Sequence, residues 1–253
     1  MKTDITQLFE RPHKFSSAPS MDVQVGGVLY RLEASGSEGI YFRKQKGEEV
    51  SEAFVNVRPK KATTLIRPAC YPEPMMLVVD KEVITYPNTK TTIYTLIPVV
   101  IQLVLSAEGM EQVLDEQKEE RVLKTHYGPV DAGVTCLLSY EPVYWREEEI
   151  GLDDEATAIV PITMINNLEN LHTMKRIVLY SEYLDLFLSG GQLYTNPIAV
   201  HILSAKEANI DYQDKSPKPQ ASKIVPRKIV PRAGRTVKQY FGQKSKAAFE
   251  YGL

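Results

Sequence analysis

The chain has 253 residues, enough for one large domain or two small ones with a substantial hydrophobic core. With 43% hydrophobic and 25% charged residues and a net charge of −2, its composition is that of a soluble globular protein rather than a disordered or collagen-like chain. The two cysteines, Cys70 and Cys136, form neither a disulfide framework nor a zinc-binding pattern, and the four histidines stand far apart. We therefore expect no metal and no cofactor.

The N-terminal residues and the apolar runs indicate where in the cell the protein is expected. Residues Met1–Gln7 lack the apolar core of a signal peptide. The most apolar run, Ile93–Leu105, is about 13 residues long, against the roughly 20 needed to span a bilayer. We expect a cytoplasmic protein without a membrane span.

Most of the chain from residue 20 to residue 205 shows the short β-rich runs and polar turns of an antiparallel sheet protein. Ala53–Val57 is one such run, and Asp80-Lys81 has the spacing of a tight hairpin or bend. Because Pro98 cannot donate to a ladder, the Thr-rich and Val-rich stretch Thr91–Leu105 should bend or lie at an edge there. The other expected strands are the two segments of Val23–Leu32 around Gly26-Gly27, then Gly39–Arg43, Met75–Val79, Glu82–Tyr86, Val134–Tyr140, Ala158–Ile165, Arg176–Tyr180 and Ala199–Leu203.

Two segments are expected to be helical. Gly109–Lys124 places Met110, Val113 and Leu114 at helical spacing, and Thr236–Ala248 could present one apolar face. The fold class is therefore mainly β: an antiparallel β-sandwich-like body of one or two sheets, a short helix and a basic C-terminal helix or strand.

The letters Leu188-Ser189-Gly190-Gly191-Gln192 match the signature motif of ABC-type ATPases. That motif works only opposite a phosphate loop, and no Gly-Lys-Ser or Gly-Lys-Thr occurs in the chain. Pro197 also follows too closely for a long helix. We interpret Gly190-Gly191 as a hairpin turn, because glycine supplies the positive φ that such turns need, and we expect no ATP binding.

The C-terminal part differs from the body in charge. Ten of the 30 basic residues and no acidic ones lie in 215–249, which leaves residues 1–214 with a net charge near −11. Within it, Lys223–Arg227 is repeated letter for letter as Lys228–Arg232. We divide the chain into an N-terminal segment (1–19), a body (20–205, with an optional split near 106–126) and a linker with the basic segment (206–253).

The basic segment provides the candidate binding residues. Cations with interleaved aromatic rings could follow a phosphate backbone, and the candidates are Lys223, Arg227, Lys228, Arg232, Arg235 and Lys238. Arg235–Phe241 is also similar to the peptide that docks on sliding clamps, through Val237, Tyr240 and Phe241, although Gly234 stands where a leading glutamine is expected. The alternative that we favour is a segment packed on the acidic body.

No catalytic constellation stands out. There is no G-x-S-x-G elbow, and the acidic runs near 147–155 are typical of solvated loops. An enzyme with a site assembled by the fold would centre on His126, Tyr127 and Cys136.

Several stretches resemble the archaeal domain-of-unknown-function 432 family. They are Thr91–Ile101, Tyr127-Gly128-Pro129, Gly133–Cys136 and the ending Phe249–Leu253, with Leu137 where the family tends to have arginine. The resemblance implies an archaeal, soluble, β-rich protein whose C-terminal segment belongs to the fold. We therefore expect a non-enzymatic binding or interaction protein, such as a subunit or regulator of a larger assembly with an unknown protein partner. Nucleic-acid association and a fold-assembled enzyme are the alternatives.

Overall fold

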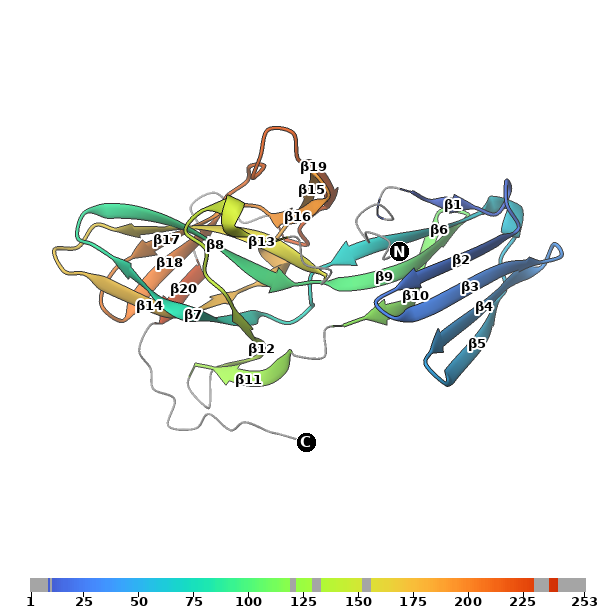
Figure 1. Cartoon of the computed structure of the whole chain (residues 1–253), viewed down its shortest axis with the longest axis horizontal. Helices are drawn as coiled ribbons and strands as arrows, with labels where there is room; N and C mark the ends of the chain where they lie inside the picture. The colour runs from blue at the N-terminus through green and yellow to red at the C-terminus, as the bar shows by residue number, and fades with distance from the viewer. Residues whose placement is uncertain are drawn as a thin grey trace. The chain divides into compact units, whose positions relative to one another are not determined.

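A computed structural model describes residues 9, 11–118, 122–128, 133–151, 156–229 and 237–240 (Figure 1). In these residues most of the regular secondary structure is β-strand, and the helical elements are short 3-10 turns at Pro59–Lys61, Glu147–Glu149 and Ser181–Tyr183. No helix in the described part is long and apolar enough to cross a membrane. The chain divides into two compact units, whose boundaries fall at 69/70, 99/100 and 118/119, with 154–156 also assigned to the first.

The first unit comprises residues 1–69, 100–118 and 154–156. It holds two four-stranded antiparallel sheets. One sheet has the order β1 (His13–Lys14), β6 (Ala62–Ala69), β9 (Val100–Ala107), β10 (Met110–Gln117). The other has the order β2 (Ser20–Val25), β3 (Val28–Ser35), β4 (Gly39–Lys46), β5 (Glu49–Val55). Apolar side chains at alternate positions fill its core, among them the fully buried Leu32, Ile40 and Leu105.

Strand β10 joins these two sheets through polar contacts. Its Asp115 accepts hydrogen bonds from the Tyr30 hydroxyl of β3 and from Lys44 of β4. Its Gln117 donates to the carbonyl of Val25 at the end of β2. The end of β10 is therefore tied to three strands of the opposite sheet.

The second unit comprises residues 70–99, 119–153 and 157–253. A four-stranded sheet has the order β11 (Leu123–Tyr127), β12 (Val134–Glu141), β7 (Met75–Thr85), β14 (His172–Leu179). The larger sheet has the order β19 (Ser222–Val225), β15 (Leu186–Ser189), β16 (Gln192–Thr195), β13 (Thr157–Asn166), β17 (Ile198–Ile202), β18 (Glu207–Tyr212), β20 (Val237–Tyr240), and β8 (Thr89–Pro98) also pairs with β13. β12 runs parallel to β7, and β13 runs parallel to both β16 and β17, so the sheets are mixed.

The mainly β class is confirmed, but the expected one or two sheets are four. The helix expected over 109–124 is wrong, and the C-terminal segment, expected to be a helix or a strand, is a strand where it is described. Residues 110–117 form β10, and residues 237–240 form β20; the remainder of the expected C-terminal helix, 241–248, lies outside the described residues. β10 leaves β9 through Glu108 and Gly109, both at positive φ, and a bulge at Leu114 adds one residue to the strand. The extra residue shifts the in-and-out alternation of side chains along β10. The apolar residues on either side of the bulge are therefore spaced as they would be in a helix.

The Gly-Gly pair predicted to form a turn does so. Ser189 pairs with Gln192 across Gly190-Gly191, whose φ values are 58° and 78°, so the signature-like letters form the tip of a two-residue hairpin. β8 ends at Pro98, and the chain passes from the second unit to the first at 99/100. Asp80-Lys81 does not reverse the chain, because β7 is one continuous strand. The pairing with β14 is nevertheless irregular there, since Val78 pairs with Arg176 and Val83 pairs with Met174, so the extra residues of β7 include Asp80-Lys81.

Candidate binding groove

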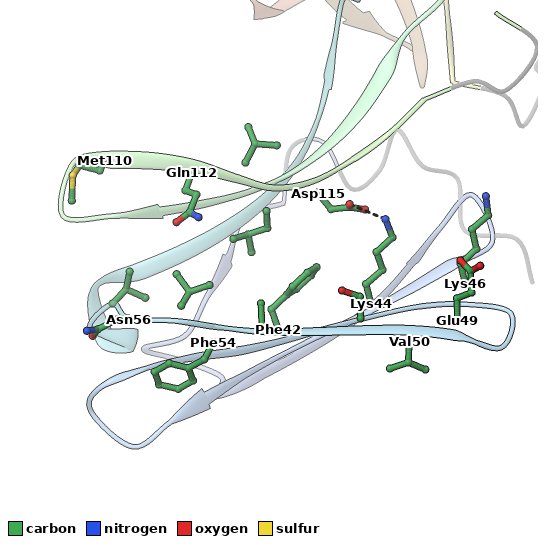
Figure 2. Close-up of a pocket in the computed structure, with 16 residues that line it drawn as sticks. Phe42, Lys44, Lys46, Glu49, Val50, Phe54, Asn56, Met110, Gln112 and Asp115 are labelled. Atoms are coloured by element: carbon green, nitrogen blue, oxygen red, sulfur yellow. Dashed lines mark hydrogen bonds and ion pairs between the residues drawn. The ribbon is translucent and has the colours of Figure 1, made fainter.

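A hollow in the first unit lies between β5 with its neighbour β4 and the overlying β10 (Figure 2). Its volume is about 1060 Å³. Sixteen residues line it: Phe42, Lys44, Lys46, Glu49, Val50, Ser51, Ala53, Phe54, Val55, Asn56, Val57, Met110, Gln112, Val113, Leu114 and Asp115. The groove thus has an apolar majority with a few charged and amide groups, which is the usual chemistry of a binding site.

Strand alternation decides which side chains face the hollow. Ala53 pairs with Phe42 and Val55 pairs with Ile40, so the apolar residues of this row lie on the core side of the sheet. Phe42 points toward β10, whereas Val50 and Phe54 lie on the opposite side of β5 (Figure 2). The edge of the sheet therefore presents apolar side chains on both faces.

The charged end of the groove is held by Asp115. Its carboxylate oxygens lie 2.8 Å from Lys44 Nζ and 2.5 Å from the Tyr30 hydroxyl. Burial, and then the hydrogen bond to Asp115, raise the pKa of Tyr30 well above its ordinary value. Tyr30 consequently stays a proton donor across the physiological pH range, and the floor at this end is fixed.

Four of the large apolar residues that line the hollow are exposed. The side chain of Met110 is 73% exposed and that of Phe54 is 56% exposed, while Val50 and Val113 are each more than 40% exposed. Met110 and Val113 lie on β10, and Val50 and Phe54 lie on β5, so exposed apolar residues are present on both strands that border the hollow, as is common at interaction sites. We call β5, the facing half of β10 and this hollow the β5 groove.

Strand β5 has a bare edge. Within the described part of the chain it pairs only with β4, and it contains no proline, no lysine and no bulge. Several other edge strands carry such protection: β10 and β14 are irregular, β1 has two residues, and Pro226 follows β19. Strand β2, at the opposite edge of the same sheet, lacks these features as well, but it does not line the hollow. Exposed edges without these features are ready to pair with another chain.

The basic segment lies in the second unit, and its described part packs on the body. Lys218 forms an ion pair with Glu147 and lies 4.7 Å from the centre of the Tyr194 ring. β19 pairs with β15, and β20 pairs with β18. The cations at 218, 223 and 227 therefore neutralise carboxylates of this unit, in line with the favoured alternative.

Arg227 is the candidate phosphate contact whose surroundings are best defined, and it is buried. Its side chain is 3% exposed and is paired with Asp185, which is 1% exposed. Burial by itself raises the pKa of Asp185, but hydrogen bonds from the side chain and backbone of Arg227 and from Lys223 outweigh burial and lower it. This guanidinium is enclosed by protein and does not face a phosphate backbone.

The other candidates of the basic segment divide into three groups. Lys223 is partly exposed but reaches Asp185 at 3.1 Å, and Lys228 is exposed. Lys238, Val237 and Tyr240 lie in β20, whose extended backbone differs from the helical turn of a clamp-docking peptide. Arg232, Arg235 and Phe241 lie outside the described residues.

Of the three candidate enzyme residues, Tyr127 packs against the apolar cluster that contains Cys136, whereas His126 lies on the other face of the sheet. Cys136 lies in an apolar cluster with Met76, Leu138 and Val178, and burial raises the pKa of its thiol to about 11. His126 pairs with Thr135, the neighbour of Cys136, so it lies on the opposite face of the sheet. A buried neutral thiol without a base beside it is a packing group. In the part of the chain that is described, no three His, Cys, Asp or Glu residues gather as metal ligands.

The β5 groove could not have been located from the sequence. Its residues come from 42–57 and 110–115, and the second stretch was expected to be a helix. The available signal was the Glu108-Gly109 turn, which separates two β-rich runs.

A family model described as a protein of unknown function (DUF432) matches residues 11–242. The chain belongs to the DUF432 family. The DUF432 match extends through β19 and β20, so the family region includes the basic segment as far as residue 242. No curated protein and no solved structure matches the chain.

Proposed function

We propose that the protein is a non-enzymatic binding protein, and that its first unit receives an extended polypeptide segment of a partner along the edge of β5. The observation that carries the proposal is the bare β5 edge beside a groove with exposed apolar side chains. In this mode a partner strand adds to the sheet, with main-chain hydrogen bonds supplying affinity and alternate side chains supplying specificity.

The chemistry of the edge points to a polypeptide. The β4–β5 hairpin has a two-residue loop, Gly47-Glu48, so Lys46 and Glu49 form its closing hydrogen-bonded pair. Hydrogen-bonded and non-hydrogen-bonded pairs alternate from there, and Val50, Glu52 and Phe54 fall at the non-hydrogen-bonded positions. Their N–H and C=O groups therefore point away from β4, and only another polypeptide backbone offers the matching alternation of acceptors and donors.

The side chains of β5 predict the character of the partner strand. Val50 and Phe54 would contact apolar residues two positions on either side of a central residue, and Glu52 would lie beside that central residue. A cation at the centre would complement Glu52. At about 3.3 Å per residue, the seven residues of β5 can pair with a segment of similar length.

The test selects binding peptides from a phage-displayed library of random extended peptides and measures each enriched peptide, as a labelled synthetic probe, on three proteins. Glu52→Pro removes one outward N–H while leaving the ladder to β4 intact, and Glu52→Ala is the matched control that removes the carboxylate alone. We expect the peptides to bind the wild type and Glu52→Ala, and to bind Glu52→Pro at least about tenfold more weakly, since a hydrogen bond and the strand register are lost.

The enriched peptides should also alternate, with apolar residues spaced four apart around a basic residue. Peptides that bind Glu52→Pro as tightly as Glu52→Ala, or a selection without enrichment, would contradict strand addition at β5.

A further inference from the structure

The exact pentapeptide repeat of the basic segment is not explained by partner binding at the β5 groove. Lys223-Ile224-Val225-Pro226-Arg227 is followed directly by a second copy, residues 228–232. The first copy contributes to β19, which lies antiparallel to β15 with Lys223 beside Phe187 and Val225 beside Leu186. The first copy therefore has a defined seat on the second unit.

That seat is built around Asp185. Its Oδ1 accepts hydrogen bonds from the Arg227 backbone N–H at 2.9 Å and from Lys223 Nζ at 3.1 Å, and its Oδ2 accepts from Arg227 Nε at 2.8 Å. Asn196 fixes this residue, because its side-chain oxygen accepts from the Asp185 backbone N–H at 2.8 Å.

Further groups complete the seat around the first and fifth residues of the pentapeptide. The remaining guanidinium donors reach the carbonyls of Tyr212 and Gln213 at 3.4 and 3.3 Å, and the carboxylate of Asp214 at 3.0 Å. Lys223 Nζ lies 5.4 Å from the centre of the Phe187 ring. We call this set of groups the Asp185 socket.

We infer that the Asp185 socket is a recognition site for the sequence Lys-Ile-Val-Pro-Arg, and that the second copy, residues 228–232, is an alternative ligand for it. The socket contacts the lysine side chain of the pentapeptide and both the side chain and the backbone N–H of its arginine. The second copy repeats each of these groups at the same spacing. A shift of the chain by five residues therefore offers the socket the same donors in the same order.

The connections on both sides are compatible with this shift. Upstream, the shift adds five residues to the irregular stretch between β18 and β19. The entropic cost of closing a loop grows only slowly with its length, so this addition costs little free energy. Downstream, Arg227 donates to the carbonyl of Tyr212, while Val237 pairs with Ile210 two residues earlier on the same strand. The arginine and β20 thus lie near the same end of β18, and the four residues that would remain between them can extend over about 17 Å.

The two registers would not be equal in every contact. In the register of the structure the backbone N–H of Ile229 donates to the carbonyl of Glu182 at 2.9 Å, and this bond belongs to the second copy. A shift of the chain by five residues breaks the bond between Ile229 and Glu182, but the buried carboxylate of Asp185 still has an arginine partner. An uncompensated buried carboxylate is far more costly than one exposed backbone bond, so the second copy should replace a damaged first copy.

The experiment compares urea unfolding midpoints of the full chain with Arg227→Ala, Arg232→Ala and the double variant, with Arg227→Ala/Arg235→Ala as the matched control. We expect no shift for Arg232→Ala, a modest shift for Arg227→Ala and for the control, and a shift at least twice as large for Arg227→Ala/Arg232→Ala. Equal shifts for Arg227→Ala and the double variant, or failure of Arg227→Ala to fold, would overturn the inference, because the second copy would then give no rescue.

A second arm tests the socket without relying on those variants. Deleting residues 223–227 joins Ser222 to Lys228 and leaves one pentapeptide, so the midpoint should fall no further than that of Arg227→Ala. A loss comparable to that of Arg227→Ala/Arg232→Ala would show that one copy with a shortened connection cannot fill the socket.

A third arm uses the labelled peptide Lys-Ile-Val-Pro-Arg on the double variant. It should bind at least about tenfold more tightly than a scrambled peptide of the same composition, and Asp185→Asn should remove the difference. Equal binding of both peptides would mean that the socket attracts charge without recognising the sequence.

Discussion

At the scale of single residues, Asp115 holds the floor of the β5 groove through bonds to Tyr30 and Lys44. Replacing it by asparagine removes the ion pair and weakens two charge-assisted hydrogen bonds in a partly buried site. We expect Asp115→Asn to lower the free energy of unfolding by about 1–3 kcal/mol. Glu111→Gln on the same strand is the control, because Glu111 is exposed and its pair with Arg67 should contribute less than about 1 kcal/mol. Urea denaturation measures both, and equal losses would contradict the structural role of Asp115.

Asp185 predicts a pH dependence whose sign follows from its lowered pKa. A carboxyl group with a lower pKa in the folded protein stabilises the fold fully above its unfolded value of about 3.9, and this stabilisation is lost as pH falls through the folded value. The stability difference between the wild type and Asp185→Asn should therefore be constant from about pH 7 to pH 5 and shrink below about pH 4. Midpoints of urea unfolding at several pH values test this, and a difference that grows toward acid would refute the assignment.

At the scale of elements, the Ser189-Gly190-Gly191-Gln192 hairpin makes a prediction about its glycines. Gly190 has a φ of 58° and open space where a Cβ would be built, so substitution there is limited by backbone conformation and not by contacts. We expect Gly190→Ala to cost about 1 kcal/mol and Gly190→Asn less, because asparagine tolerates the left-handed region. Thermal unfolding of the two variants tests the order, and a larger loss for Gly190→Asn would contradict the turn type.

At the scale of the whole molecule, the charge asymmetry is partly resolved inside the second unit. Lys218, Lys223 and Arg227 are paired with Glu147 and Asp185. The nucleic-acid hypothesis must therefore rest on the other cations of the segment, and Arg227 should be left intact in any test of it.

The corresponding prediction uses Lys228→Gln/Arg232→Gln/Arg235→Gln and a labelled single-stranded 20-nucleotide DNA. Because several cations already neutralise protein carboxylates, we expect weak binding by the wild type in 50 mM salt and little change in the triple variant. Tight binding that is lost both in the triple variant and on raising the salt to 200 mM would establish nucleic-acid association instead.

The β-rich class, the glycine hairpins and the end of β8 at Pro98 could be predicted from the sequence, because each depends on local chemistry. Positive φ at Gly26-Gly27 and Gly190-Gly191, and the missing donor of Pro98, act within a few residues of chain.

The remaining features depend on contacts between residues that are far apart in the chain. Residues 110–117 form the strand β10 because they pair with β9. The bulge in β10 gives its apolar residues a spacing that is also typical of a helix. Arg227 changed from a candidate phosphate contact to a buried partner of Asp185, 42 residues away in the chain. The β5 groove likewise joins residues more than 50 positions apart. Pairing, burial and ion-pair partners over such separations are set by the folded chain as a whole, and local patterns in the sequence do not encode which distant segment will supply the other half.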